Sequence, residues 1–147
     1  TKLLIVGRGS LKKRLVKQAK RLGISSSVRI DSGMPFDKLA EEFRNADLVV
    51  YPSYYEGQGL IPLEAMASGT PVATVNHGPL PEMVDDSVGA LFTMADIESM
   101  SSVILNLLSD PDDLESRGKA GRERVLENFS FGQNAERFSQ IYSQLAN

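Results

Sequence analysis

Two glutamates flank a glycine-rich turn in the middle of the sequence. Glu56 and Glu64 are separated by seven residues, and Gly57 and Gly59 lie between them. Glycine lets the backbone approach a ligand closely, and amides that precede a helix N-terminus favour negative charge such as a phosphate. Carboxylates accept hydrogen bonds from hydroxyl groups. The combination fits a ligand in which a phosphate is flanked by hydroxyl-bearing rings, the layout of a nucleotide sugar.

A purely structural interpretation of the same glutamates is also open. Glu56 could cap the helix that follows, and Glu64 could be a solvated helix residue. Glu64, however, lies within the apolar run from Leu63 to Ala67. We therefore expect its carboxylate to be at least partly buried, and buried carboxylates usually have partners.

Short apolar runs alternate with amphipathic segments along the chain. The predicted strands are residues 3–6, 28–31, 48–51, 72–75 and 89–92, and the predicted helices are residues 11–22, 35–45, 62–68, 96–108, 111–128 and 131–145. This alternation predicts an α/β fold, a Rossmann-like doubly wound parallel sheet with a helical C-terminal tail. We expect the first strand to be buried on both faces, Ser10 to cap the first helix, and the tail to pack back on the sheet. In such sheets ligands bind outside the carboxyl ends of the strands, which is where Glu56 would lie.

The composition narrows the possible functions. The chain has 147 residues, 41% hydrophobic and 24% charged, which is typical of one soluble globular domain. The net charge of −3 gives no basic bias, so we expect no nucleic-acid partner. The absence of cysteine excludes disulfides, thiolate metal sites and cysteine nucleophiles. No apolar run approaches the roughly 20 residues that span a bilayer.

Other motifs carry less weight. Gly7, Arg8 and Gly9 begin like a dinucleotide-binding fingerprint, but the third glycine is absent, and only Asp31 comes near the acidic position that would hold a ribose. We therefore set NAD binding aside and interpret Arg8 as a solvated turn residue in preference to a phosphate ligand. His77, the only histidine, follows a predicted strand and is interpreted as a surface residue.

Acidic and aromatic side chains complete the candidates. Asp112 and Asp113 fit the start of a helix, where acids suit the dipole, so we expect no bound metal. Tyr51 is expected in the core, whereas Tyr54 and Tyr55 are loop residues that could stack on a base or sugar.

The segment from Tyr51 to Val72 resembles the E-x7-E signature of the retaining glycosyltransferases of family 4, which have two Rossmann-like domains in the GT-B architecture. The signature in this setting is highly specific, and the resemblance covers nearly the whole chain. Weaker matches flank it at residues 4–9, 28–33, 46–53, 78–84 and 129–131.

The resemblance implies a role for each matching position. Glu56 would be the catalytic-site glutamate that binds hydroxyls of the donor sugar, and Glu64 would bind the ribose. Backbone amides would contact the sugar and diphosphate from Gly57, Gln58, Gly59 and Leu60. Gly33 and Met34 would line the base pocket. Gln58 departs from the aromatic or apolar residue usual in the family, which bears on sugar preference.

The resemblance further implies that residues 1–147 are the C-terminal donor-binding domain of a longer enzyme, lacking its first strand, a basic pair and the N-terminal acceptor domain. That enzyme would transfer the sugar of a UDP-, GDP- or ADP-linked donor to a glycan, lipid or small molecule. It would need no cofactor, and it would act in the cytoplasm or at the inner face of the membrane, with peripheral membrane contact through the N-terminal domain. We expect the fragment alone to be inactive. The alternatives are a non-catalytic nucleotide-binding domain or a GT-B relative such as a sugar-nucleotide epimerase.

Overall fold

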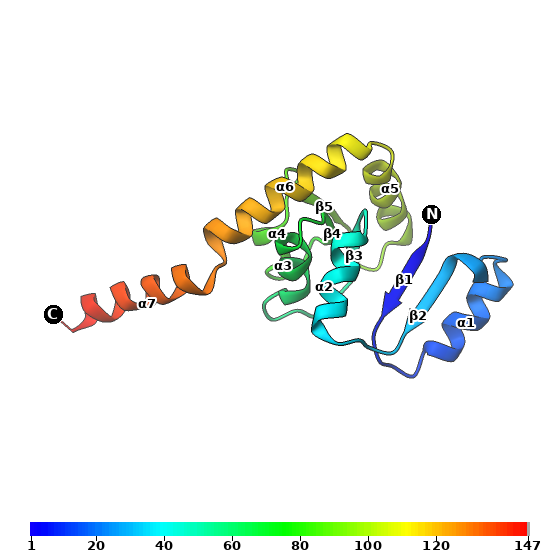
Figure 1. Ribbon diagram of the computed structural model, residues 1–147, viewed down its shortest axis with the longest axis horizontal. Helices are drawn as coiled ribbons and strands as arrows, with labels where there is room; N and C mark the ends of the chain where they lie inside the picture. Colours follow the sequence, from blue (N-terminus) through cyan, green and yellow to red (C-terminus); the bar gives the residue numbers. More distant parts are fainter. Residues whose placement is uncertain (147) are drawn as a thin grey trace. The chain divides into compact units, whose positions relative to one another are not determined.

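Strands and helices alternate along the chain, and the computed structural model describes residues 1–146 (Figure 1). The elements are β1 (Leu3–Val6), α1 (Lys12–Arg21), the 3₁₀ turn η1 (Ser25–Ser27), β2 (Val28–Asp31), α2 (Phe36–Asn45), β3 (Val49–Tyr51), α3 (Leu60–Ala67), β4 (Val72–Val75), α4 (Leu80–Met83), β5 (Gly89–Phe92), α5 (Ile97–Leu108), α6 (Pro111–Asn128) and α7 (Phe131–Leu145). All five predicted strands are present, so the α/β prediction is confirmed.

The chain divides into two compact units, residues 1–39 and the residues from 40 onward. In the first unit, β1 and β2 pair in parallel, with Leu3 opposite Val28. In the second unit, the strands follow the order β3-β4-β5, and both pairs are parallel. Parallel strands place their carboxyl ends at one edge of a sheet, so the loops after β3, β4 and β5 emerge at the same edge of the second unit.

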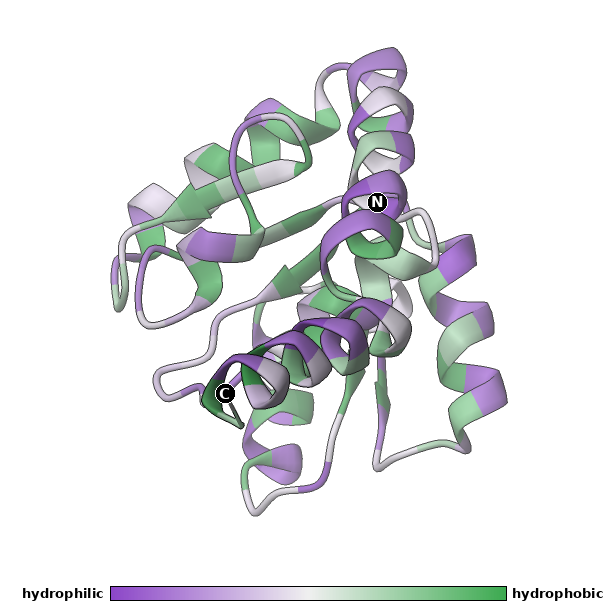
Figure 2. Cartoon of the chain, turned by 90° about the vertical axis from the view of Figure 1, so that its left-hand side faces the viewer, coloured by the Kyte–Doolittle hydropathy of each residue, from purple (hydrophilic) through white to green (hydrophobic). Residues whose placement is uncertain are grey.

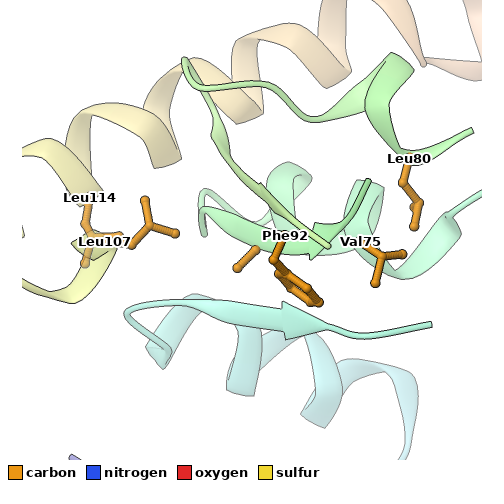
Figure 3. Close-up of a cluster of buried hydrophobic side chains, with 6 residues drawn as sticks. Val75, Leu80, Phe92, Leu107 and Leu114 are labelled. Carbon is orange, nitrogen blue, oxygen red and sulfur yellow. The ribbon is translucent and has the colours of Figure 1, made fainter. Parts of the chain in front are cut away.

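The core of the second unit is built around β4, in which all four residues are buried. Figure 3 shows the side chains that gather there from β4, β5 and the helices, with Val75, Leu80, Phe92, Leu107 and Leu114 labelled. A strand buried on both faces is typically a nearly continuous apolar run, and β4 is apolar except for Thr74, whose hydroxyl donates to the Tyr51 carbonyl. This rigid centre supports the loops that carry the candidate site.

Helix α6 packs against α3 through a glycine. A Cβ atom on Gly118 would lie 2.2 Å from the carbonyl oxygen of Gly69, which ends the turn after α3. The close approach is possible only because Gly118 has no side chain. It fixes α6 across the helix that follows the glycine-rich turn.

The first unit is less buried than expected. Leu3 and Val6 in β1 are 50% and 37% exposed, and Ala19 is the one buried residue that α1 contributes. The prediction that β1 is buried on both faces is therefore wrong within this unit, because two strands and the short helices beside them offer few neighbours.

Helix boundaries follow the predictions with three differences. The N-cap of α1 is Leu11 and no side chain caps this helix, so the prediction of Ser10 is wrong. Helix α3 begins at Leu60, two residues before Pro62, and α4 was not predicted. Asp112 and Asp113 lie in the first turn of α6, as expected.

The three helices of the C-terminal tail differ in how they pack. Helices α5 and α6 pack in the second unit and contribute buried residues, whereas α7 buries none. The prediction that the tail packs back is thus wrong for α7, whose apolar side chains are exposed, Phe131 to 95%. The helices carry both hydropathy colours in Figure 2, as amphipathic helices do. Between residues 1 and 146, no helix is long and apolar enough to cross a bilayer.

Candidate functional site

The glycine-rich turn connects the end of β3 to the start of α3. Gly59 is the N-cap of α3 and adopts a left-handed conformation, with φ 75° and ψ 42°. A Cβ atom here would lie 2.9 Å from Met83 Cε and 3.0 Å from Leu80 Cδ2, both on α4. Glycine is therefore required twice, for its backbone conformation and for the close approach of α4. These two constraints fix the path of the turn.

The Glu56 carboxylate is held by groups of its own loop and of β3. The hydroxyl of Tyr51 donates to Oε2 at 2.6 Å. The amides of Gly57 and Gln58 donate to Oε1 at 3.1 and 3.4 Å. The hydrogen bond from Tyr51, followed by those from the backbone amides, lowers the pKa of Glu56 below its ordinary value. Glu56 is thus an ionised, oriented acceptor at neutral pH.

The start of α3 leaves hydrogen-bond donors free. The amides of Gly57 and Gln58, which were predicted to contact a ligand, turn toward the Glu56 carboxylate instead, and the Gly59 amide also bonds to it. Further along, the amides of Leu60 and Ile61 have no acceptor within residues 1–146. First-turn amides lack an intrahelical partner and carry the positive end of the helix dipole. The free donors at this site are therefore those of α3 itself.

Glu64 lies on α3, four residues after Leu60. Its side chain is half-buried, as expected, but no group in the described part of the chain donates to its carboxylate. Four residues is about one helical turn, so Glu64 stands roughly 6 Å along the axis from the start of the helix, on the same face as Leu60. Helix α3 thus places an open helix start and an unpartnered carboxylate one turn apart.

The loop after β4 passes beside the Glu56 loop. Gly78 has a φ of 60°, and a Cβ atom on it would lie 3.8 Å from the carbonyl oxygen of Glu56. His77, the residue before it, is exposed. Tyr54 and Tyr55 are also exposed, to 67% and 91%. The interpretation of His77 as a surface residue is therefore confirmed, and the stacking role considered for the two tyrosines stays a prediction.

The residues predicted to line the base pocket belong to the first unit. Gly33 has a φ of 123°, and a Cβ atom on it would lie 3.3 Å from Nε of Arg8. Arg8 Nε donates to the Ser32 carbonyl at 3.1 Å, and Lys12 Nζ donates to the Ser32 hydroxyl at 2.7 Å. Arg8 is thus more than a solvated turn residue, because it holds the loop that carries Gly33 and Met34. Lys12 was not foreseen, since its pairing joins α1 to a loop 20 residues away.

A cavity of about 170 Å³ opens at the carboxyl ends of β3, β4 and β5. Its walls are mainly apolar and include Pro52, Val75, Phe92 and Met100. Tyr54, one of the two loop tyrosines considered for stacking, lines it, whereas Glu56 and Glu64 do not. The polar groups that could bind a charged ligand therefore lie on the Glu56 loop and α3. Among residues 1–146, no cluster of three or more potential metal ligands is present.

Solved structures identify the fold. The chain matches sucrose-phosphate synthase from Thermosynechococcus elongatus with a TM-score of 0.85 and 31% identity, over 98% of this chain and 38% of that one. It matches TarM of S. aureus, in a complex that includes UDP, with a TM-score of 0.83 and 28% identity, over 97% of this chain and 29% of that one. The fold is therefore the Rossmann-like half of a GT-B glycosyltransferase.

The family follows from the sequence match. Residues 1–124 match the model of the family described as glycosyl transferases group 1, and the chain belongs to this family. It is 38% identical over 125 residues to the MMP alpha-(1->4)-mannosyltransferase of Mycolicibacterium hassiacum, a match that covers 84% of this chain and 30% of that protein. The chain thus spans about a third of the length of the relatives that it matches.

Proposed function

We propose that this chain binds a nucleoside-diphosphate sugar as the donor-binding domain of a retaining glycosyltransferase of family 4. The observation that carries the proposal is the arrangement on one loop and helix: an ionised Glu56 held in place, free amides at the start of α3, and an unpartnered Glu64 one turn further on. These groups match a sugar hydroxyl, a phosphate and a ribose in the order in which a nucleotide sugar presents them.

Each part of the donor has a proposed partner. The diphosphate would lie at the start of α3, where the Leu60 amide and its neighbour meet negative charge. Glu56 would accept a hydrogen bond from a hydroxyl of the sugar, and Glu64 would accept from the ribose. Gly33 and Met34 would contact the base, on the loop that Arg8 fixes.

In the intact protein, the sugar would pass to a glycan, lipid or small-molecule acceptor with its anomeric configuration retained. Charge develops on the leaving diphosphate during such a transfer, and preorganised donors that face this charge lower the barrier. The free amides of α3 provide such donors, and basic side chains outside this chain would add to them. We propose that the chain alone has little or no transferase activity, since an acceptor domain would form the other half of the cleft. A cytoplasmic location, at the membrane face or away from it, stays a prediction.

The test is calorimetry with UDP, GDP and ADP and with their glucose and mannose conjugates. Removing a hydrogen bond to a charged group costs about 1.5–3 kcal/mol, or roughly 10- to 100-fold in affinity. Glu64→Ala should weaken the nucleotides and their conjugates alike. Glu56→Gln should weaken only the conjugates, because the free nucleotides lack the sugar.

Glu123→Gln provides the matched control, since Glu123 is an exposed glutamate of α6. It should bind every ligand as the wild type does. Unchanged binding in both site variants would overturn the assignment of the site. Nucleotide binding that is indifferent to the attached sugar would favour the non-catalytic alternative, and epimerisation of the bound sugar would favour the epimerase. Efficient sugar transfer by the chain alone would contradict the predicted inactivity.

A further inference from the structure

Tyr51 joins the core of the second unit to the candidate site. Its ring packs against the buried cluster, as its sequence context predicts. Its backbone carbonyl accepts a hydrogen bond from Thr74 Oγ1 at 2.9 Å, which ties the end of β3 to β4. Its hydroxyl reaches out of the core and donates to Glu56 Oε2 at 2.6 Å. A distance this short is typical of a hydroxyl that donates to an ionised carboxylate.

The Glu56 carboxylate has little capacity left for a ligand. An ionised carboxylate offers about four acceptor positions. The Tyr51 hydroxyl donates to Oε2, the amides of Gly57 and Gln58 donate to Oε1, and a hydrogen bond from the Gly59 amide also stabilises the ionised carboxylate. Because the Gln58 bond is long, at 3.4 Å, at most about one acceptor position stays open for a donor from outside the protein.

We propose that Tyr51 is a positioning residue. It holds the Glu56 carboxylate so that this carboxylate accepts a hydrogen bond from a single hydroxyl of the donor sugar. The inference rests on the proposed function, in which Glu56 binds the sugar. Because the Tyr51 hydroxyl takes one position on Oε2 and the loop amides bond to Oε1, the carboxylate is held in one orientation and its open position points in one direction. A sugar whose hydroxyl has the opposite configuration at the contacted carbon cannot use it.

The charge state of the pair supports this role. Tyr51 is the largest cause of the lowered pKa of Glu56, ahead of the backbone amides. Burial, followed by the bond to Glu56, raises the pKa of Tyr51, so the hydroxyl stays a donor at neutral pH. The loop and the elements around the pair carry further titratable groups, namely Tyr54, Tyr55, Glu64 on α3, His77 beside Gly78 and Glu82 on α4, and none of them donates a hydrogen bond to Glu56 in the described residues. Tyr51 is the titratable partner that contacts the carboxylate.

The test uses Tyr51→Phe, which keeps the ring in the core and removes only the hydroxyl. The measured quantity is the sugar contribution, the affinity for the glucose conjugate of UDP, GDP or ADP relative to the affinity for the same nucleotide alone. The variant should lose about fivefold to tenfold of this contribution, the effect of one hydrogen bond. Its affinity for the nucleotide alone should not change. It should also discriminate less between the glucose and galactose conjugates.

The pH profile provides a readout that a packing defect would not move. The sugar contribution needs an ionised Glu56, so it is lost as the pH falls through the pKa of this group. Without the tyrosine hydroxyl that pKa rises, and the loss should therefore occur at a higher pH in Tyr51→Phe than in the wild type. Tyr142→Phe, on the exposed surface of α7, is the matched control and should leave the profile unchanged.

A double-variant cycle separates this inference from the proposed function. In a Glu56→Gln background, Tyr51→Phe should cause little further loss, because both changes act on the same contact. The inference would be overturned if Tyr51→Phe changed neither the sugar contribution nor the pH at which this contribution is lost. It would also be overturned if the variant lost the same affinity for the nucleotide as for its sugar conjugate. If Glu56→Gln itself leaves the sugar contribution intact, the proposed role of Glu56 falls and the inference falls with it.

Discussion

Gly59 offers a sharp test of how the site is built. Replacing it with alanine adds one methyl group to the left-handed N-cap of α3. The new Cβ atom would lie 2.9 Å from Met83 Cε and 3.0 Å from Leu80 Cδ2. Real Cβ atoms do not approach other atoms so closely, so the side chains of Met83 and Leu80, α4 itself or the turn must shift. Leu80 is fully buried in the core, which limits how far its side chain can move.

The cost has two parts. A left-handed conformation costs an L-residue about 1–2 kcal/mol relative to glycine. Adding a methyl group to a packed region costs about 1–3 kcal/mol. Together they give a loss of about 3 kcal/mol in the free energy of unfolding, which corresponds to a fall of roughly 10 °C in Tm for a chain of this size.

Gly57→Ala is the matched control, because Gly57 belongs to the same turn and its added methyl group would have no neighbouring atom within 4 Å. Thermal and urea unfolding of the two variants measure the difference directly, and calorimetry with a nucleotide sugar reports the Glu56 loop. Gly59→Ala should be much less stable than Gly57→Ala and should bind the nucleotide sugar less tightly. Equal stability of the two variants would refute the reasoning that contact with α4 fixes the turn.

Two further predictions concern the packing and the charges around this site. Gly118→Ala should destabilise the chain by about 3 kcal/mol or more, because its Cβ would meet the Gly69 carbonyl, whereas Gly132→Ala has open space and should be neutral or slightly stabilising in the same urea titration. The hydrogen bond from Arg124 lowers the pKa of Asp85 from its ordinary value near 3.8 to about 2. The stability that the ionised Asp85 contributes is therefore fully present above about pH 3.8 and is lost as the pH falls toward about 2. Asp85→Asn should therefore lose less stability than the wild type over this acid range in urea unfolding, and parallel profiles would contradict the role of this ion pair.

The sequence predicted the burial of β4 correctly and the burial of β1 wrongly. The run from Val72 to Val75 is apolar throughout except for Thr74, and β4 is buried at every position. The equally apolar run from Leu3 to Val6 predicted the same burial, yet both its end residues are exposed. An apolar run indicates that a strand can be buried, but the neighbours that cover it come from other parts of the fold.

The tail shows a similar limit. The amphipathic spacing of α5, α6 and α7 predicted three helices, and all three form with boundaries close to those expected. The same spacing could not tell which helix finds a partner. Gly118 allows α6 to approach the end of α3, a contact that joins residues far apart in the sequence, whereas α7 buries no side chain.

The sequence by itself determined the α/β class, the position of the glycine-rich turn and the choice of Glu56 and Glu64, because each depends on residue type and local spacing. Tertiary structure decided how those residues are used. It turned the amides of Gly57 and Gln58 toward Glu56, left Glu64 without a partner, and placed the Tyr51 hydroxyl on the carboxylate. These contacts depend on the path of a loop between a strand and a helix, and that path is set by the packing of α4 against Gly59.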